Sequence, residues 1–172
     1  TTGAPGTNAS VTNSGTSSDA VFNFVIPRGD TGNCECQCRS FGTFPVTNAT
    51  LENNSLVMLA VGTVSPDSYT LSASKNTISL PGGCMHIVSF SFTCTGTTSL
   101  VITPVINGTS NTAYAQYSQV GSKNDNISVS GTFPVPASSV STVAFKITLP
   151  QGTKITLSGV VTITGAGALP TI

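Results

Sequence analysis

Short apolar runs, separated at close intervals by glycine, proline, asparagine and serine, constrain the fold of this chain more than any other feature. From about Phe41 onward there are about ten such runs, and none has the length or the periodicity of an amphipathic helix. They cover residues 56–61, 69–71, 77–80, 85–93, 100–106, 112–119, 127–133, 143–149, 154–157 and 160–164. Short strands spaced roughly 8 to 15 residues apart are typical of a β-sandwich or barrel. The sequence therefore predicts an all-β body.

The stretch between the last two cysteines shows the strand pattern most clearly. Its even positions are nearly all apolar: Cys84, His86, Val88, Phe90, Phe92 and Cys94. Side chains two residues apart share a face of a strand, so we expect this face to point into the sandwich. The odd face is apolar at one end and hydroxylic at the other: Met85, Ile87, Ser89, Ser91 and Thr93.

The chain has five cysteines, an odd number that cannot pair completely within one molecule. Cys84 and Cys94 stand ten residues apart on one predicted strand, which corresponds to about 33 Å. The Cα atoms of a disulfide lie only about 4.4–6.8 Å apart. We therefore expect no bond between these two residues and interpret both as buried free thiols that act as small hydrophobic side chains.

Cys34, Cys36 and Cys38 share a face if the segment that carries them is extended. A structural zinc site needs four ligands, usually in pairs with two intervening residues. Three cysteines at this spacing do not match that pattern, so we predict no metal. They are candidates for interchain disulfides that form a collar at the base of the body. Free thiols and contacts with other molecules remain open alternatives.

No arrangement of side chains in the sequence indicates catalysis. His86 is the only histidine, and its distance from Cys84 on the same strand face is about 6–7 Å, too long for a nucleophile–base pair. We expect a core histidine with a local hydrogen bond. The six carboxylates are scattered, without a pair for acid–base chemistry or a calcium-binding loop. We therefore predict that the chain is not an enzyme and that it needs no cofactor.

Charge and hydropathy exclude two classes of partner. Six basic and six acidic residues give a net charge of zero, whereas binding to nucleic acid requires clustered lysine and arginine. No apolar run approaches 18 residues, so we predict no membrane insertion. A surface of hydroxyls and amides suits an extracellular or assembled protein, and we expect this chain on an extracellular surface.

The first 39 residues differ from the rest. Gly3 and Gly6 are three residues apart, and Gly29 and Gly32 repeat that spacing, as the axis of a collagen triple helix requires. The frame breaks after two triplets, so we interpret this region as the end of a longer collagen-like tract. Between the glycine pairs, a turn at residues 13–15 and alternation over residues 21–26 predict a β-hairpin. A hairpin of this size cannot bury its own phenylalanines, but three copies around an axis could. The predicted domains are a stem, residues 1–39, and a head, residues 40–172.

Three sequence segments of the head resemble those of a known protein family. ISLPGGCMHIVSFSF at residues 78–92 and LVITPVINGT at residues 100–109 resemble the globular heads of the tumour-necrosis-factor and complement superfamily. VAFKITLPQGTKITL at residues 143–157 is similar to a C-terminal signature of those heads, although Gln151 stands where aspartate is more usual. The resemblance implies a ten-stranded antiparallel jelly roll that is trimeric about the stem axis.

The stem carries a second resemblance. GTNASVTNSGT at residues 6–16 and FVIPRGDTG at residues 24–32 are similar to modules beside collagen-like tracts in bacterial surface proteins and phage fibres. Together the two resemblances point to the exosporium (spore-surface) glycoproteins of bacilli and clostridia. Sequons for asparagine glycosylation occur at Asn8, Asn48, Asn53, Asn107 and Asn126.

These inferences combine into a functional hypothesis. The chain is expected to be a structural head that forms a homotrimer and nucleates a collagen-like filament on a spore or cell surface. Expected partners are further copies of the chain, other spore-surface proteins and host-surface ligands. The alternative is the receptor- or glycan-binding tip of a phage tail fibre or adhesin. The candidates for outward-facing side chains at the trimer axis are Tyr114, Tyr117, Phe133 and Phe145.

Overall fold

The computed structural model describes residues 2–3, 7–27, 40–47, 49–66 and 68–169. The chain divides into two compact units, Thr1–Glu35 and Cys36–Ile172. The first unit contains the hairpin, and the second is an all-β head. Residues 28–39, which include Cys34, Cys36 and Cys38, lie outside the described residues.

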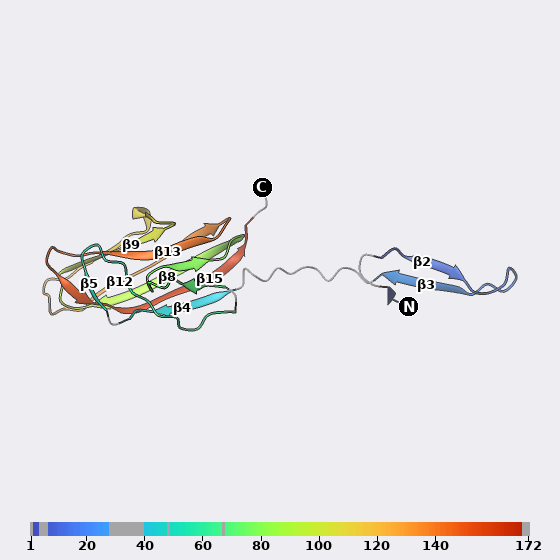
Figure 1. Ribbon diagram of the computed structural model, residues 1–172, viewed down its shortest axis with the longest axis horizontal. Coiled ribbons are helices and arrows are strands. Elements are labelled where there is room, and N and C mark those ends of the chain that lie inside the picture. Colours follow the sequence, from blue (N-terminus) through green and yellow to red (C-terminus); the bar gives the residue numbers. More distant parts are fainter. Residues whose placement is uncertain (1, 4–6, 28–39, 48, 67, 170–172) are drawn as a thin grey trace. The chain divides into compact units, whose positions relative to one another are not determined.

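The head is a sandwich of two antiparallel sheets (Figure 1). The first, here named the β8 sheet, has the order β12-β8-β15-β4; the second, named the β9 sheet, has the order β10-β9-β13-β7-β6, with β11 also paired to β9. The β8 sheet consists of β4 (Phe41–Pro45), β8 (Cys84–Cys94), β12 (Ile127–Ala137) and β15 (Ser158–Ala168). The β9 sheet consists of β6 (Thr70–Leu71), β7 (Ile78–Leu80), β9 (Ser99–Ile106), β10 (Thr109–Ser110), β11 (Gln116–Gln119) and β13 (Ser141–Thr148). A separate two-stranded sheet pairs β5 (Thr50–Glu52) with β14 (Lys154–Thr156).

The core lies between the two sheets and is dominated by aromatic rings. Every even position of β8 is buried, so the inward face predicted for this strand is confirmed. Phe90 and Phe92 contact Phe145 of β13, with ring centroids 5.2 and 5.6 Å away, and Phe133 of β12 lies 6.3 Å from the same ring. Phe133 and Phe145 are 1% and 0% exposed. Their predicted outward positions are therefore wrong, because apolar side chains at alternate positions of β12 and β13 fill the space between the sheets.

Two details of the predicted strands differ from the structure. Residues 56–61 form no regular strand and instead make single bridges, including Leu56 with Lys146 and Leu59 with Val46. The run at 112–119 begins with a one-turn 3₁₀ helix, Thr112–Tyr114, before β11. The sequence also missed the short strands β4, β5 and β10. Tertiary pairing decides such short segments, because alternation over two to five residues is too brief to be distinctive.

The outer edges of the β8 sheet are protected in two ways. Beyond β4, residues 58–63 continue the hydrogen bonding, with Gly62 N donating to Thr43 O at 2.9 Å and Ala60 N donating to Pro45 O at 2.8 Å. At the opposite edge, β12 carries Pro134 and Pro136. Because proline lacks an N–H group, these residues remove donors from the edge and discourage continued pairing.

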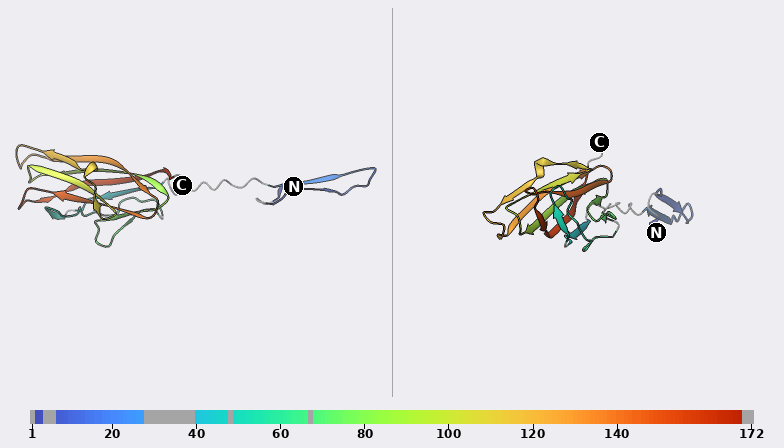
Figure 2. Two further views of the ribbon diagram at one scale, coloured as in Figure 1. Left: turned by 90° about the horizontal axis from the view of Figure 1, so that it is seen from above. Right: turned by 60° about the vertical axis from the view of Figure 1, so that its left-hand side comes forward.

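The N-terminal unit is a small three-stranded sheet (Figure 2). β2 (Ser10–Asn13) and β3 (Phe22–Pro27) form the predicted antiparallel hairpin. β1 (Thr2–Gly3) lies parallel to the end of β3. The side chains of β2 and β3 are exposed or half-buried throughout, so these two strands do not enclose a core.

Candidate functional site

The outward face of the β8 sheet is the first candidate surface. The four strands of this sheet contain no aspartate, glutamate, lysine or arginine. By contrast, β13 of the β9 sheet carries Lys146, and Glu52 of β5 forms an exposed ion pair with Lys154 of β14. A charge-free sheet face can approach another uncharged surface without the desolvation cost of buried ions.

This face changes character along the strands, as the sequence of β8 predicts. At one end Met85 and Ile87 are half-buried and stand opposite Pro136 and Pro134 of the edge strand. Farther along, Ser89 and Thr132 form a hydrogen bond between their hydroxyls at 2.9 Å. The predicted transition from an apolar to a hydroxylic end is confirmed.

The pairing between strands extends the apolar end of this face from β8 to β15 and β4. Ile87 pairs with Thr164 of β15, which in turn pairs with Phe41 of β4. The Phe41 side chain is 46% exposed, and that of Val160, farther along β15, is 38% exposed. Pro134 and Pro136 of β12 are exposed as well. Apolar side chains therefore reach the surface on all four strands, on the face turned away from the core.

Two tyrosines lie beside this sheet, along the edge formed by β12 and β11. Tyr114 stacks on Phe133, with ring centroids 5.1 Å apart and an interplanar angle of 17°. Tyr117 is 60% exposed and donates its hydroxyl hydrogen bond to Gln119. Tyr114 is half-buried against the core, whereas Tyr117 is exposed. A role of either residue at a trimer axis stays a prediction.

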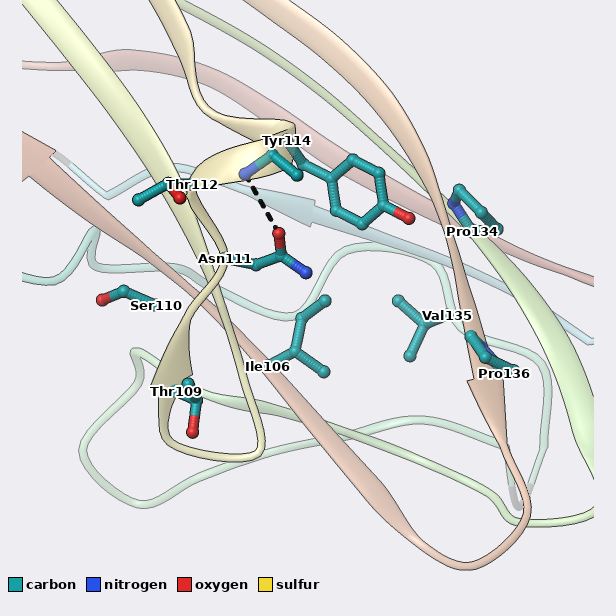
Figure 3. A pocket seen from close by; sticks show the side chains of 10 residues that line it. Ile106, Thr109, Ser110, Asn111, Thr112, Tyr114, Pro134, Val135 and Pro136 are labelled. Carbon is teal, nitrogen blue, oxygen red and sulfur yellow. Dashed lines mark hydrogen bonds between the residues drawn. The ribbon is translucent and has the colours of Figure 1, made fainter.

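A pocket of about 480 Å³ opens next to Tyr114 (Figure 3). Its walls come from the end of β9, the turn that follows and the edge strand β12. Asn111 caps the 3₁₀ helix there by accepting a hydrogen bond from Ala113 N at 3.2 Å. Tyr114, Pro134 and Pro136 supply apolar walls, and Thr109, Ser110 and Thr112 line the other side. Sequence reasoning missed this pocket because it depends on how β12 lies against a turn some twenty residues earlier.

His86 is part of a buried polar network at the start of β8. It is fully buried, its Nε2 lies 2.9 Å from Pro81 O, and its Nδ1 lies 3.2 Å from the Tyr69 hydroxyl. Because a carbonyl oxygen only accepts, Nε2 donates to Pro81 O, and in that tautomer Nδ1 accepts from the Tyr69 hydroxyl. Ser40 Oγ donates to the Tyr69 hydroxyl oxygen at 2.9 Å. The predicted core histidine with a local hydrogen bond is confirmed.

The network also affects the ionisation of the tyrosine. Burial raises the pKa of Tyr69, and the hydrogen bond from Ser40 partly offsets that rise. Tyr69 therefore remains a neutral donor at physiological pH. Both ring nitrogens of His86 are occupied, so the ring is a structural element that holds β8 against the loop at Pro81 and the start of β4.

The two cysteines of β8 differ in state. Cys94 is a buried free thiol, as predicted, and burial raises the pKa of its thiol to about 11. Cys84 is disulfide-bonded, so the free thiol predicted there is wrong. Since Cys94 is free, the two do not bond each other, which agrees with their separation along the strand. A disulfide sulfur cannot serve as a thiolate nucleophile beside His86.

Other classes of site find no support in the described residues. No group of three or more histidine, cysteine, aspartate or glutamate side chains lies close enough to hold a metal ion within the described part of the chain. No helix among these residues has the length and hydropathy needed to cross a bilayer. The collar predicted for Cys34, Cys36 and Cys38 falls outside the described residues and stays a prediction.

Comparison with known proteins identifies the fold. The structure is similar to the globular domain of zebrafish complement 1qA protein, with a TM-score of 0.57, 13% identity, and coverage of 74% of this chain and 99% of that one. It is also similar to murine APRIL, with a TM-score of 0.54, 9% identity, and coverage of 73% and 98%. Eiger TNF from S. frugiperda matches with a TM-score of 0.55, 8% identity, and coverage of 76% and 94%. The head therefore has the antiparallel jelly-roll fold of the complement and tumour-necrosis-factor type, as predicted.

Comparison at the level of sequence adds nothing to this. No protein-family model matches the chain. No curated protein matches it either. At identities of 8–13%, the structural likeness establishes the fold alone.

Proposed function

We propose that this chain is a non-enzymatic head that forms a homotrimer and nucleates a collagen-like filament on a bacterial cell or spore surface. The observation that carries the proposal is the charge-free outward face of the β8 sheet, with its exposed apolar end. A face with exposed Phe41 and half-buried Met85 and Ile87 gains free energy when another copy covers it.

The fold and the stem support the same proposal. The resemblance to tumour-necrosis-factor and complement heads implies trimers, and the glycine spacing on both sides of the hairpin favours a collagen-like continuation. Collagen chains find their register slowly, and a head that trimerises first holds three chain ends at high effective concentration. The uncharged, hydroxyl-rich surface suits an extracellular layer, where the sequons could be glycosylated.

The test compares the mass in solution of the wild-type chain with that of a variant that carries one lysine on the proposed interface. We expect the wild-type chain, of 17.4 kDa, to have about three times that mass by mass photometry or sedimentation. Ile87→Lys should give a monomer, because the new ammonium would be buried without a partner. Val105→Lys is the matched control, since Val105 is a half-buried aliphatic residue on the outward side of the β9 sheet. A wild-type monomer at micromolar concentration would contradict the proposal.

The pocket beside Tyr114 favours one alternative function, a receptor- or glycan-binding tip of a phage fibre or adhesin. Its size and its combination of an aromatic wall, prolines and hydroxyls suit a small polar ligand. Glycan-array binding by the trimer that Thr109→Arg abolishes would favour this alternative. Equal binding by the two chains, or no binding, would leave the structural role as the better account.

A further inference from the structure

The hairpin carries an exposed apolar face that the head does not explain. Val11 of β2 pairs with Phe24 of β3, so these side chains lie on the same face as Phe22 and Ile26. The exposed fractions are 55% for Val11, 58% for Phe22, 57% for Phe24 and 64% for Ile26. In the head, apolar side chains at equivalent alternating positions of β8 are buried. Four large exposed apolar residues on one small sheet indicate a binding surface.

The turn of the hairpin fixes this face through its own polar contacts. Asn13 Oδ1 accepts hydrogen bonds from Gly15 N at 2.9 Å and from Val21 N at 3.0 Å. Thr16 Oγ1 accepts from Asp19 N at 3.1 Å. A Cβ at Gly15 would lie 2.1 Å from Asp19 O, so only glycine fits. The face is therefore presented by a locally ordered backbone, which reduces the entropy lost on binding.

Charge and chain direction favour a second copy of the same hairpin as the occupant. Between residues 7 and 27 the only charged residue is Asp19, at the turn, so identical faces meet without ionic repulsion. Thr2–Gly3 runs parallel to Ile26–Pro27, so the chain approaches and leaves the hairpin in the same direction. The paired glycines, spaced by three, stand on both sides: Gly3 and Gly6 before it, Gly29 and Gly32 after it. In a trimeric filament, three copies of this face would meet at the same level of the stem.

We propose that the Val11, Phe22, Phe24 and Ile26 face of each hairpin binds the same face of two further copies, forming a second trimeric contact in the stem. This inference rests on the proposed function, because the head brings the three stems together. Cyclic symmetry closes the contact at three copies and leaves no open surface for further growth. The stem would then be a folded part of the assembly in its own right.

The experiment uses the whole chain and a pair of valines that differ only in the face they occupy. Val11 lies on the proposed contact face, and Val25 lies on the opposite face of β3. We expect Val11→Ser to raise the concentration at which trimers dissociate by about tenfold or more, because three buried methyl-rich side chains are lost per trimer. Val25→Ser should leave it unchanged. The dissociation would be followed by sedimentation, and hydrogen exchange over residues 10–27 would report the hairpin directly.

The head variant Ile87→Lys separates this proposal from the proposed function. If Val11→Ser has no effect while Ile87→Lys dissociates the trimer, the hairpin contact is overturned and the head stands. If Ile87→Lys leaves the trimer intact while Val11→Ser dissociates it, the stem contact stands and the head proposal fails. Equal effects of the two valine substitutions would indicate damage to the hairpin itself and would overturn the contact. A wild-type chain that is monomeric would overturn both.

Discussion

The hairpin and the head use the same strand pattern with opposite results. In β8, Val88, Phe90 and Phe92 alternate with outward residues and are 0%, 3% and 0% exposed. In β3, Phe22 and Ile26 also alternate, but they are 58% and 64% exposed. Alternation thus fixes the strand and the residues that share a face, whereas burial depends on what packs against that face.

The difference follows from the number of layers. The head folds a second sheet over the inward face of the first, so one chain completes its own core. The hairpin unit is a single small sheet and has no second layer among its described residues. The apolar face of this single layer is left uncovered within the unit, and the proposed contact with the hairpins of further copies would cover it.

The largest expected effect comes from opening a cavity in the head. Phe145→Ala should lower the free energy of unfolding of the head by about 3–5 kcal/mol, because the ring is fully buried among other aromatics. Urea denaturation in the Ile87→Lys background would measure this without a contribution from association. Phe22→Ala in the hairpin is the control and should change head unfolding by less than about 0.5 kcal/mol. Similar losses of unfolding free energy in both variants would contradict the contrast between a buried core in the head and an exposed apolar face in the hairpin.

The next effect is the chemical protection of Cys94. Its pKa of about 11, raised by burial from an ordinary value near 9, leaves about 100-fold less thiolate at pH 8 than an unburied thiol would have. The reactivity of the Cys94 thiol should therefore rise with pH until the pH reaches about 11, because only the thiolate is alkylated. Alkylation followed by peptide mass spectrometry should show slow modification of Cys94 in the folded head and fast modification in urea. Rapid labelling of the folded protein at pH 8 would mean that the core around β8 opens readily.

A smaller effect is expected from the buried polar network. Tyr69→Phe removes the donor to His86 Nδ1 and the acceptor for Ser40, and should destabilise the head by about 1–3 kcal/mol. Tyr117→Phe is the matched control, because Tyr117 is 60% exposed and solvent can replace its contact. Equal stability of the two variants would show that the hydrogen bonds of the buried Tyr69 hydroxyl contribute no more to stability than those of an exposed hydroxyl.

The smallest effect on the head should come from damage to the hairpin. Gly15→Ala places a Cβ within 2.6 Å of Val21 N and closer still to Asp19 O, so the turn must open. We expect hydrogen exchange over residues 10–27 to accelerate while the free energy of head unfolding stays within about 0.5 kcal/mol of the wild type. Gly121→Ala is the control, since no atom lies within 4 Å of its added Cβ. A large loss of head stability in Gly15→Ala would show that the two units do not fold independently.

Much of the fold could be predicted from the sequence because its signals are local. The alternation of β8 gave its inward face, and the turn at Asn13–Gly15 gave the hairpin, since both depend on residues within a few positions of each other. The spacing of Cys84 and Cys94 excluded a bond between them, because strand geometry fixes their distance. The chemistry of the outward face of β8 also followed directly from its odd positions.

The candidate site was only partly predictable. Tyr117 is exposed and Tyr114 is half-buried, but Phe133 and Phe145 are core residues, because the sequence did not specify which face of β12 and β13 would meet the other sheet. The pairing of Tyr69 with His86, and the pocket at Asn111, join residues whose proximity no local pattern encodes. The disulfide at Cys84 was missed for the same reason.

The sequence alone determined that this chain forms short strands, that it lacks the charges for nucleic acid, and that its hairpin gathers apolar side chains on one face. These properties depend on backbone preference and side-chain chemistry at neighbouring positions. Only the tertiary structure decided which aromatic rings fill the core, which sheet face stays free of charge at the surface, and which polar groups satisfy His86. Those outcomes depend on contacts between strands far apart in the chain, where the burial of one face is set by the sheet that covers it.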